Sequence, residues 1–228
     1  MLPSTRVPHV RNAALVIGIA VTSLGVLVLL AWHTHVVWII SLSPNSDPMP
    51  YDTALGLTLA GASLCTGLLG RRRWSVGLAV GVAVIAALTL AEYAIGRQLG
   101  IDQLIVRDYV HPEAAHPGRV APNTALCLFV SAVGLLVARG LIRVRRQGLA
   151  LALCGSLVAG LGLEALAGHV VHISAAYAWR GHESMAVHTA VGLVCIGVAL
   201  VLIAWEVSAD GQHSPRWLAV PIASVVAS

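Results

Sequence analysis

Six long runs of apolar residues, separated by short polar segments, set the pattern of the chain. They cover residues 13–40, 53–70, 75–96, 124–141, 148–173 and 189–207. A helix that crosses a bilayer needs about 20 mostly apolar residues, and each run is close to that length. A seventh run starts at Trp217 and reaches only Ser228, which is too short to cross. The pattern therefore predicts an all-α, polytopic membrane helix bundle of six spans and the start of a seventh, cut from a longer protein.

A short motif that occurs three times groups these runs into pairs. It reads MPYDTAL at 49–55, VAPNTAL at 120–126 and MAVHTAV at 185–191. Each copy opens the second run of a pair, while the first run of each pair ends near His35, Gly96 or His172. Repeats of this kind indicate one supersecondary unit used several times. We expect three two-helix hairpins over about 13–70, 75–142 and 148–207, which together form a membrane domain at 13–207. Residues 1–12 are then an N-terminal segment, and 208–228 a linker with the start of the seventh helix.

Composition agrees with a membrane location. The chain is 57% hydrophobic and only 11% charged, whereas a soluble domain carries about 25% charged residues. Its basic residues are all Arg, and they cluster in the short segments before 13, at 71–73 and at 139–146. Short Arg-rich loops remain in the cytoplasm, so we expect a cytoplasmic N-terminus and three longer loops on the outside. This distribution is typical of topology signals, so we expect the lipid bilayer, and not nucleic acid, as a partner.

The polar residue of each motif stands where a helix begins. A helix start leaves four backbone N–H groups without partners, and Asp52 and Asn123 are strong caps, whereas His188 is a weak one. If the hairpins surround a common axis, these residues come to one level at the outer ends of the helices. We expect a ligand pocket there, lined by Asp52, Thr53, Glu92, Tyr93, Asn123, Thr124 and Thr189.

Histidines gather at the same predicted level, and three interpretations of them stay open. In the first, His35, His169, His172 and His188 bind copper or zinc, since neutral imidazoles suit these metals and His169 and His172 share a helix face. In the second, one haem lies between His188 and either His35 or His169. In the third, the side chains cap helices and hydrogen-bond across hairpins. The pocket then binds an organic ligand, responds to pH through histidine, or binds nothing.

Several segments resemble the membrane-embedded N-terminal regions of bacterial sensor proteins. They read AEY at 91–93, LGIDQL at 99–104, HPGRVAPNTALC at 116–127 and MAVHTAVG at 185–192. In that family, a multi-helix input region precedes PAS, histidine-kinase or diguanylate-cyclase modules. The family pattern usually has Gly or aliphatic residues where this chain has His33, His35 and His172, which favours a specialised site.

The resemblance implies a function and a location. It implies a sensor domain in the bacterial inner membrane, most often of a histidine kinase, with a C-terminal cytoplasmic signalling module and a homodimeric assembly. The sequence contains no catalytic motif, so no catalytic residues are predicted. The alternative is a stand-alone membrane metal or haem redox protein that uses the outer histidines.

Overall fold

The computed structural model describes residues 8–42, 47–113, 116–173, 176–178 and 183–209. Within these residues the chain forms seven helices. They are α1 (Pro8–Thr34), α2 (Val37–Ser41), α3 (Tyr51–Leu68), α4 (Arg72–Ile95), α5 (Pro122–Ala138), α6 (Gln147–Val171) and α7 (Val187–Ala209). The described part has no β-strand and only an isolated bridge between Ala178 and Ser184. The predicted all-α class is confirmed.

Four of these helices, α1, α4, α6 and α7, are long and apolar enough to cross a membrane. They indicate a membrane protein. Helix α5 is apolar but shorter, and α3 carries Asp52 and several threonines among its 18 residues. Of the six predicted spans, four therefore correspond to helices that are long and apolar enough to cross a membrane, while α3 and α5 fall short by length or composition.

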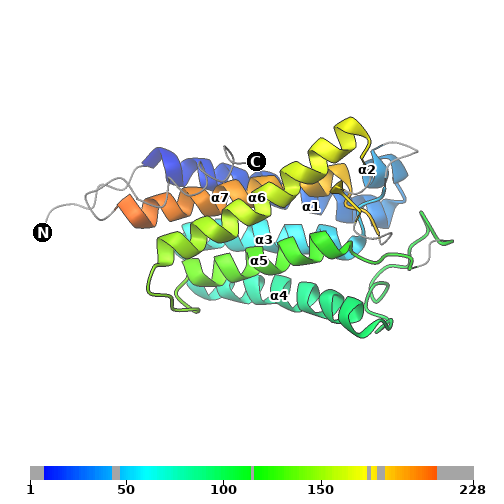
Figure 1. Ribbon diagram of the computed structural model, residues 1–228, viewed down its shortest axis with the longest axis horizontal. Helices are drawn as coiled ribbons and strands as arrows, with labels where there is room; N and C mark the ends of the chain where they lie inside the picture. Colours follow the sequence, from blue (N-terminus) through cyan, green and yellow to red (C-terminus); the bar gives the residue numbers. More distant parts are fainter. Residues whose placement is uncertain (1–7, 43–46, 114–115, 174–175, 179–182, 210–228) are drawn as a thin grey trace, which may run out of the picture.

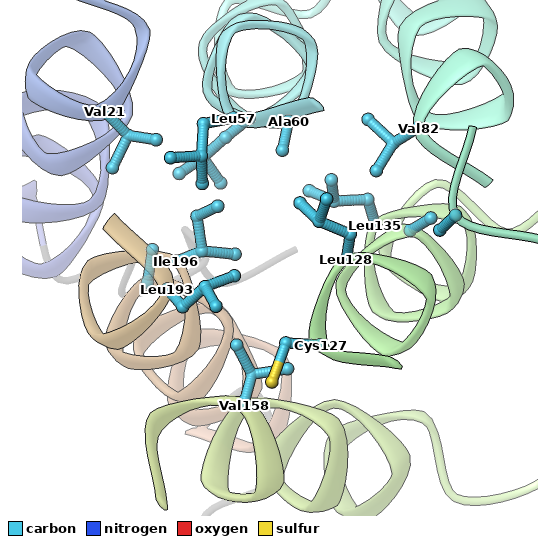
Figure 2. Close-up of a cluster of buried hydrophobic side chains, with 14 of the residues drawn as sticks. Val21, Leu57, Ala60, Val82, Cys127, Leu128, Leu135, Val158, Leu193 and Ile196 are labelled. Atoms are coloured by element: carbon cyan, nitrogen blue, oxygen red, sulfur yellow. The ribbon is translucent and has the colours of Figure 1, made fainter. Parts of the chain in front are cut away.

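The long helices lie side by side along one axis (Figure 1). Helices α3, α5 and α7 contact one another at the centre, while α1 packs against α3 and α7, α4 against α3 and α5, and α6 against α5 and α7. Their buried apolar side chains meet in one core (Figure 2), to which every long helix contributes. Examples are Val21, Leu57, Val82, Leu128, Val158 and Leu193.

The connections divide the bundle into two ends. Helix α2 and the long α4–α5 connection lie at one end, which we call the outer end (Figure 1). The short α3–α4 and α5–α6 connections lie at the other, which we call the inner end. The outer-end segments before α3, between α4 and α5, and between α6 and α7 are called the first, second and third outer loops.

Two predicted boundaries need correction. Helix α1 begins at Pro8, within the segment predicted to precede the domain, since proline is well tolerated in the first turn of a helix. The first apolar run is not one helix to residue 40, because it breaks after Thr34 and resumes as α2. The linker and seventh helix predicted for 208–228 lie almost entirely outside the described residues.

The break after α1 has counterparts at the ends of α4 and α6. His35, Gly96 and His172 follow these helices with positive φ angles of 55°, 68° and 58°. The left-handed conformation costs a non-glycine residue roughly 1–2 kcal/mol. These are the three positions that the repeat pattern aligned, so the equivalence extends to the backbone conformation. The histidines stand where glycine would be least strained.

Candidate functional site

The polar residues of the three motifs occupy the same helical position. Asp52, Asn123 and His188 are each the second residue of their helix, α3, α5 and α7. Pro50 and Ala121, not Asp52 and Asn123, are the N-cap residues of α3 and α5. Within the first turn of α5, Oδ1 of Asn123 still accepts the N–H of Thr124 at 2.9 Å. Its Nδ2 donates to the carbonyl of Tyr177 at 3.1 Å, which fastens the third outer loop to α5. The threonines that follow, Thr53, Thr124 and Thr189, are buried.

A buried charged cluster lies at the outer end, between α4 and the second outer loop. Nε of Arg119 is 3.2 Å from Oδ2 of Asp102 and 3.7 Å from Oε2 of Glu92. The three residues are 6%, 8% and 0% exposed, respectively. Oε1 of Glu92 also accepts the backbone N–H of Leu99 at 2.6 Å. The cluster thus ties the end of α4 to both halves of the loop that follows it.

The cluster holds two carboxyl groups for one guanidinium. The carboxyl groups of Glu92 and Asp102 lie within hydrogen-bonding reach of each other, yet Oε2 of Glu92 and Oδ1 of Asp102 are buried without a donor. Burial, and next the negative charge of Glu92, raises the pKa of Asp102 to about 6, while Arg119 opposes the rise. The raised pKa means that the Asp102 carboxyl takes up a proton more readily than a free aspartate does, and a proton there reduces the excess of negative charge around Arg119.

Tyr93 connects this cluster to the third outer loop. Its ring lies under the guanidinium of Arg119, with Cζ 5.3 Å from the ring centroid. Its hydroxyl is 2.5 Å from Oε2 of Glu183 and 3.0 Å from the carbonyl of Val120. Residues 90 positions apart in the sequence are therefore in direct contact. A displacement of Glu183 would reach α4 through Tyr93, and a displacement of Arg119 would reach it through Tyr93 and Glu92.

A cavity of about 230 Å³ opens above these groups, between the three outer loops. Its polar lining comes from every loop and consists of Asp47, Asp108, His111, His116, Arg119, Glu183 and Ser184. Asp108 shapes the wall, since Oδ1 accepts the N–H groups of Val110 and His111 and Oδ2 accepts that of Gly118. The other carboxylates and imidazoles give the cavity a polar surface that is rich in acceptors.

The predicted ligand-binding residues do not line this cavity. Glu92 and Tyr93 lie one contact away, because they touch Arg119 and Glu183, which do line it. Asp52 lies close enough to Glu92 and Asp102 to feel their charge, and it lines a separate, smaller apolar pocket with Leu55 and Ile101. Asn123 and the three threonines are buried in the bundle. The structure thus places these residues at the same end of the bundle as the cavity, but not in its wall.

The four predicted metal ligands have separate environments. His35 lies against Tyr109, with ring centroids 4.4 Å apart. His169 stacks on Tyr177 at 4.0 Å, and its Nε2 lies 2.8 Å from the carbonyl of Met185. A carbonyl only accepts, so this nitrogen carries a proton and is not free for a metal. His172 is exposed at the end of α6.

His188 is the buried member of that set, at 6% exposure. The carbonyl of Ile40 faces its ring, but neither ring nitrogen makes a hydrogen bond. Across the described residues, no group of three or more His, Cys, Asp or Glu side chains is placed to hold a metal ion. The predicted convergence of His35, His169, His172 and His188 is therefore not seen.

Sequence reasoning missed Asp102, Arg119 and Glu183. The first two stand inside the segments at 99–104 and 116–127 that carry the family resemblance. Opposite charges in one loop, on either side of a proline- and glycine-rich turn, were the available signal. Nothing local marks Glu183, whose partner Tyr93 comes from another hairpin.

Searches against models of known protein families, curated proteins and solved structures found no match. The site therefore has to be interpreted from its own geometry.

Proposed function

We propose that the chain is the membrane input domain of a signal-transduction protein, a histidine kinase, and that it perceives its signal in the outer cavity. One observation supports this more than any other. Arg119 and Glu183 both line the cavity, and both contact residues of α4: Arg119 contacts the buried Glu92, and Glu183 accepts a hydrogen bond from the half-buried Tyr93. An occupant that moves either side chain acts directly on a long helix that reaches the inner end.

The proposed signal is a small polar molecule that donates hydrogen bonds. Asp47 and Glu183 offer carboxylate oxygens, and His111 and His116 offer imidazole nitrogens. A cavity of about 230 Å³ is below the roughly 300–1,000 Å³ of drug-sized pockets, which favours a compact ligand. Such a ligand shifts the bundle only if it binds one of two conformations better than the other.

The proposed architecture has three hairpins: α1 with α3, α4 with α5, and α6 with α7. In it α3 and α5 also cross the inner membrane, with the N-terminus in the cytoplasm. Their central position supports this proposal, because neighbouring helices shield them from lipid. A shielded helix tolerates the polar residues and short length that set α3 and α5 apart.

The output passes to a cytoplasmic module after α7, in a homodimer. Glu164 on α6 supports an assembly of this kind. Its side chain is exposed on a helix that is otherwise apolar enough to cross a membrane. A carboxylate at such a position is costly against lipid, and a partner helix would cover it.

A distance measurement across the inner end tests the proposal. Spin labels at Arg145 and Trp205 would be introduced after replacement of the native cysteines Cys65, Cys127, Cys154 and Cys195. If the outer site controls the inner end, Asp102→Asn changes the distance distribution between the labels. Arg97→Gln, which removes an exposed outer-end charge, serves as the matched control and leaves the distribution unchanged. Identical distributions for the parent protein and Asp102→Asn would sink the proposal.

The metal form of the stand-alone alternative requires the outer histidines to come together, and no group of three or more His, Cys, Asp or Glu side chains among the described residues is placed to hold a metal ion. The haem form requires only His188 with His35 or His169, and Nε2 of His169 already faces the carbonyl of Met185.

A further inference from the structure

A second cavity, of about 320 Å³, lies at the inner end among the ends of α1, α3, α5 and α7. Its polar lining is Arg11, Arg139 and Glu206, and much of the rest is aliphatic. Both guanidiniums reach the last carbonyls of α3. Nη2 of Arg11 donates to Leu68 at 2.7 Å, and Nη1 of Arg139 donates to Gly67 at 2.9 Å. Two cations from neighbouring helices thus cap the negative end of α3.

Capping α3 uses only part of the Arg139 guanidinium. Its Nε and Nη2 are buried and have no hydrogen-bond partner. A buried donor without an acceptor is destabilising, and more so in a charged group. These two nitrogens lie on one edge of a planar fork that suits two oxygens of a carboxylate or phosphate. Arg139, which lines the cavity, thus has two donors that α3 does not use.

The net positive charge of the cavity lining favours a ligand with a single negative charge. Arg11 and Arg139 contribute two positive charges, and Glu206 contributes one negative charge that acts on Arg139. No ion pair joins Glu206 to Arg139 among the described residues. Exposed arginines at 71–73 and at 143, 145 and 146 surround the same end. A monoanion balances the cavity, and a hydroxyl or ammonium group on that anion would satisfy Glu206.

The apolar part of the lining distinguishes a lipid from a free ion. Leu68, Leu69, Ile203 and Val207 line the cavity together with the arginines. Leu69, directly after α3, and Val207, near the end of α7, are 59% and 38% exposed. A phosphodiester with attached acyl chains meets both kinds of surface at once, and basic pockets between membrane helices on the cytoplasmic side bind such headgroups.

We propose that this inner cavity binds the phosphodiester headgroup of a membrane phospholipid, with the phosphate held by Arg139 and Arg11 and the headgroup terminus beside Glu206. This inference does not depend on the proposed sensor function, because it rests on another cavity at the opposite end. Gly67 makes the site feasible, since a Cβ at that position would collide with the guanidinium of Arg139.

The test titrates dioleoyl phosphatidylglycerol into the delipidated chain in detergent, with native mass spectrometry for bound lipid and a melting curve for stability. Dioleoylglycerol has the same acyl chains without phosphate, and inorganic phosphate has the anion without chains. We expect the phospholipid alone to bind and to raise the melting midpoint. Arg139→Gln should weaken binding about tenfold or more, as for the loss of a charge-assisted bond. Arg145→Gln removes an exposed charge at the same end and should change binding less than about twofold.

Glu206→Gln keeps the test decisive if Arg139→Gln fails to fold, since Arg139 also caps α3. This variant removes the like charge and should tighten binding of phosphatidylglycerol severalfold. Equal losses for Arg139→Gln and Arg145→Gln, or an unchanged affinity for Glu206→Gln, would overturn the site. A shift reproduced by inorganic phosphate would overturn the lipid assignment in favour of a free anion. Equal binding of dioleoylglycerol would overturn the role of the phosphate.

Discussion

The two ends of the bundle hold arginine side chains in opposite ways. At the outer end, the buried Arg119 lies against Glu92 and Asp102, so acids outnumber the cation there. At the inner end, Arg11 and Arg139 lie against backbone carbonyls at the end of α3. Carbonyls carry only partial negative charge, so the inner arginines keep their net charge. The outer arginine is paired with acids of its own chain, whereas the inner arginines still attract an anion.

This difference shows what each end is suited to do. Because the pKa of Asp102 is raised toward neutrality, the charge of the outer cluster changes when a nearby group or the local pH changes. Such a cluster suits a responsive site. An end with spare guanidinium donors suits a constant partner, such as the headgroup of a surrounding lipid. The following experiments test that contrast.

Removing the outer cation should have the largest effect. Arg119→Gln leaves two buried carboxyl groups without a counter-ion, and breaking a buried pair in this way costs about 3–5 kcal/mol. We expect a large drop in the free energy of unfolding in detergent and a low yield of folded protein. Arg97→Gln, an exposed charge on the same loop, is the control and should be near neutral. Adding Asp102→Asn to Arg119→Gln should recover part of the lost stability. If Arg119→Gln were as stable as the parent protein, Arg119 would not be the counter-ion of the two buried acids.

Overpacking the contact between Gly67 and Arg139 should have an intermediate effect on stability. Gly67→Ala places a methyl group against the guanidinium of Arg139, and overpacking of this kind costs about 1–3 kcal/mol. The melting midpoint should fall accordingly. Gly77→Ala is the matched control, because a Cβ on Gly77 in α4 meets nothing within 4 Å. That variant should gain up to about 1 kcal/mol from helix propensity, and a loss equal to that of Gly67→Ala would argue against the inner contact.

The raised pKa of Asp102 predicts a pH dependence of stability of about 1 kcal/mol. This pKa is raised from 3.8 to about 6 on folding, so the folded state binds the proton of Asp102 more tightly than the unfolded state. The contribution is fully present below about pH 4 and is lost as the pH rises through about 6. The melting midpoint should therefore rise by roughly 2–4 °C from pH 7 to pH 5, by comparison with Asp102→Asn. Parallel pH profiles for the two proteins would rule out a raised pKa at Asp102.

The smallest effect is expected at the strained helix ends. His172→Gly relieves a positive φ that costs roughly 1–2 kcal/mol, offset by about 0.4–1 kcal/mol of unfolded-chain entropy. A net gain of about 0.5 kcal/mol should appear as a higher melting midpoint. His35→Gly is the comparison, because it also removes the contact with Tyr109 and should gain less. A loss of stability in His172→Gly would show that this histidine makes a contact worth more than its strain.

The sequence pattern located the helices and their equivalent positions well. Apolar runs identified every long helix, and the repeated motif placed Asp52, Asn123 and His188 at one helical position. The three positions aligned by the pattern, His35, Gly96 and His172, share a left-handed conformation that the sequence reasoning did not predict. These features depend on local periodicity and backbone geometry, which a sequence encodes directly.

The side-chain partners could not be found in the same way. Arg139 was interpreted as a topology signal, yet its guanidinium reaches the carbonyl of Gly67, 72 residues away. The stacking of His169 on Tyr177 depends on the path of the third outer loop. Such contacts are decided by how loops fold over helix ends, and charge patterning carries no information about that path.

The separation of partners along the chain also gives the outer end an order of assembly. Asp102 and Arg119 are 17 residues apart and lie in the single connection between α4 and α5. Their charges can be matched while that hairpin emerges during synthesis, before any later segment exists. The contacts of Asn123 with Tyr177 and of Tyr93 with Glu183 span 54 and 90 residues, and they wait for the last hairpin. A chain that ended after α5 would thus carry the Asp102–Arg119 pair but lack Glu183 and Ser184, so its outer cavity would be unfinished.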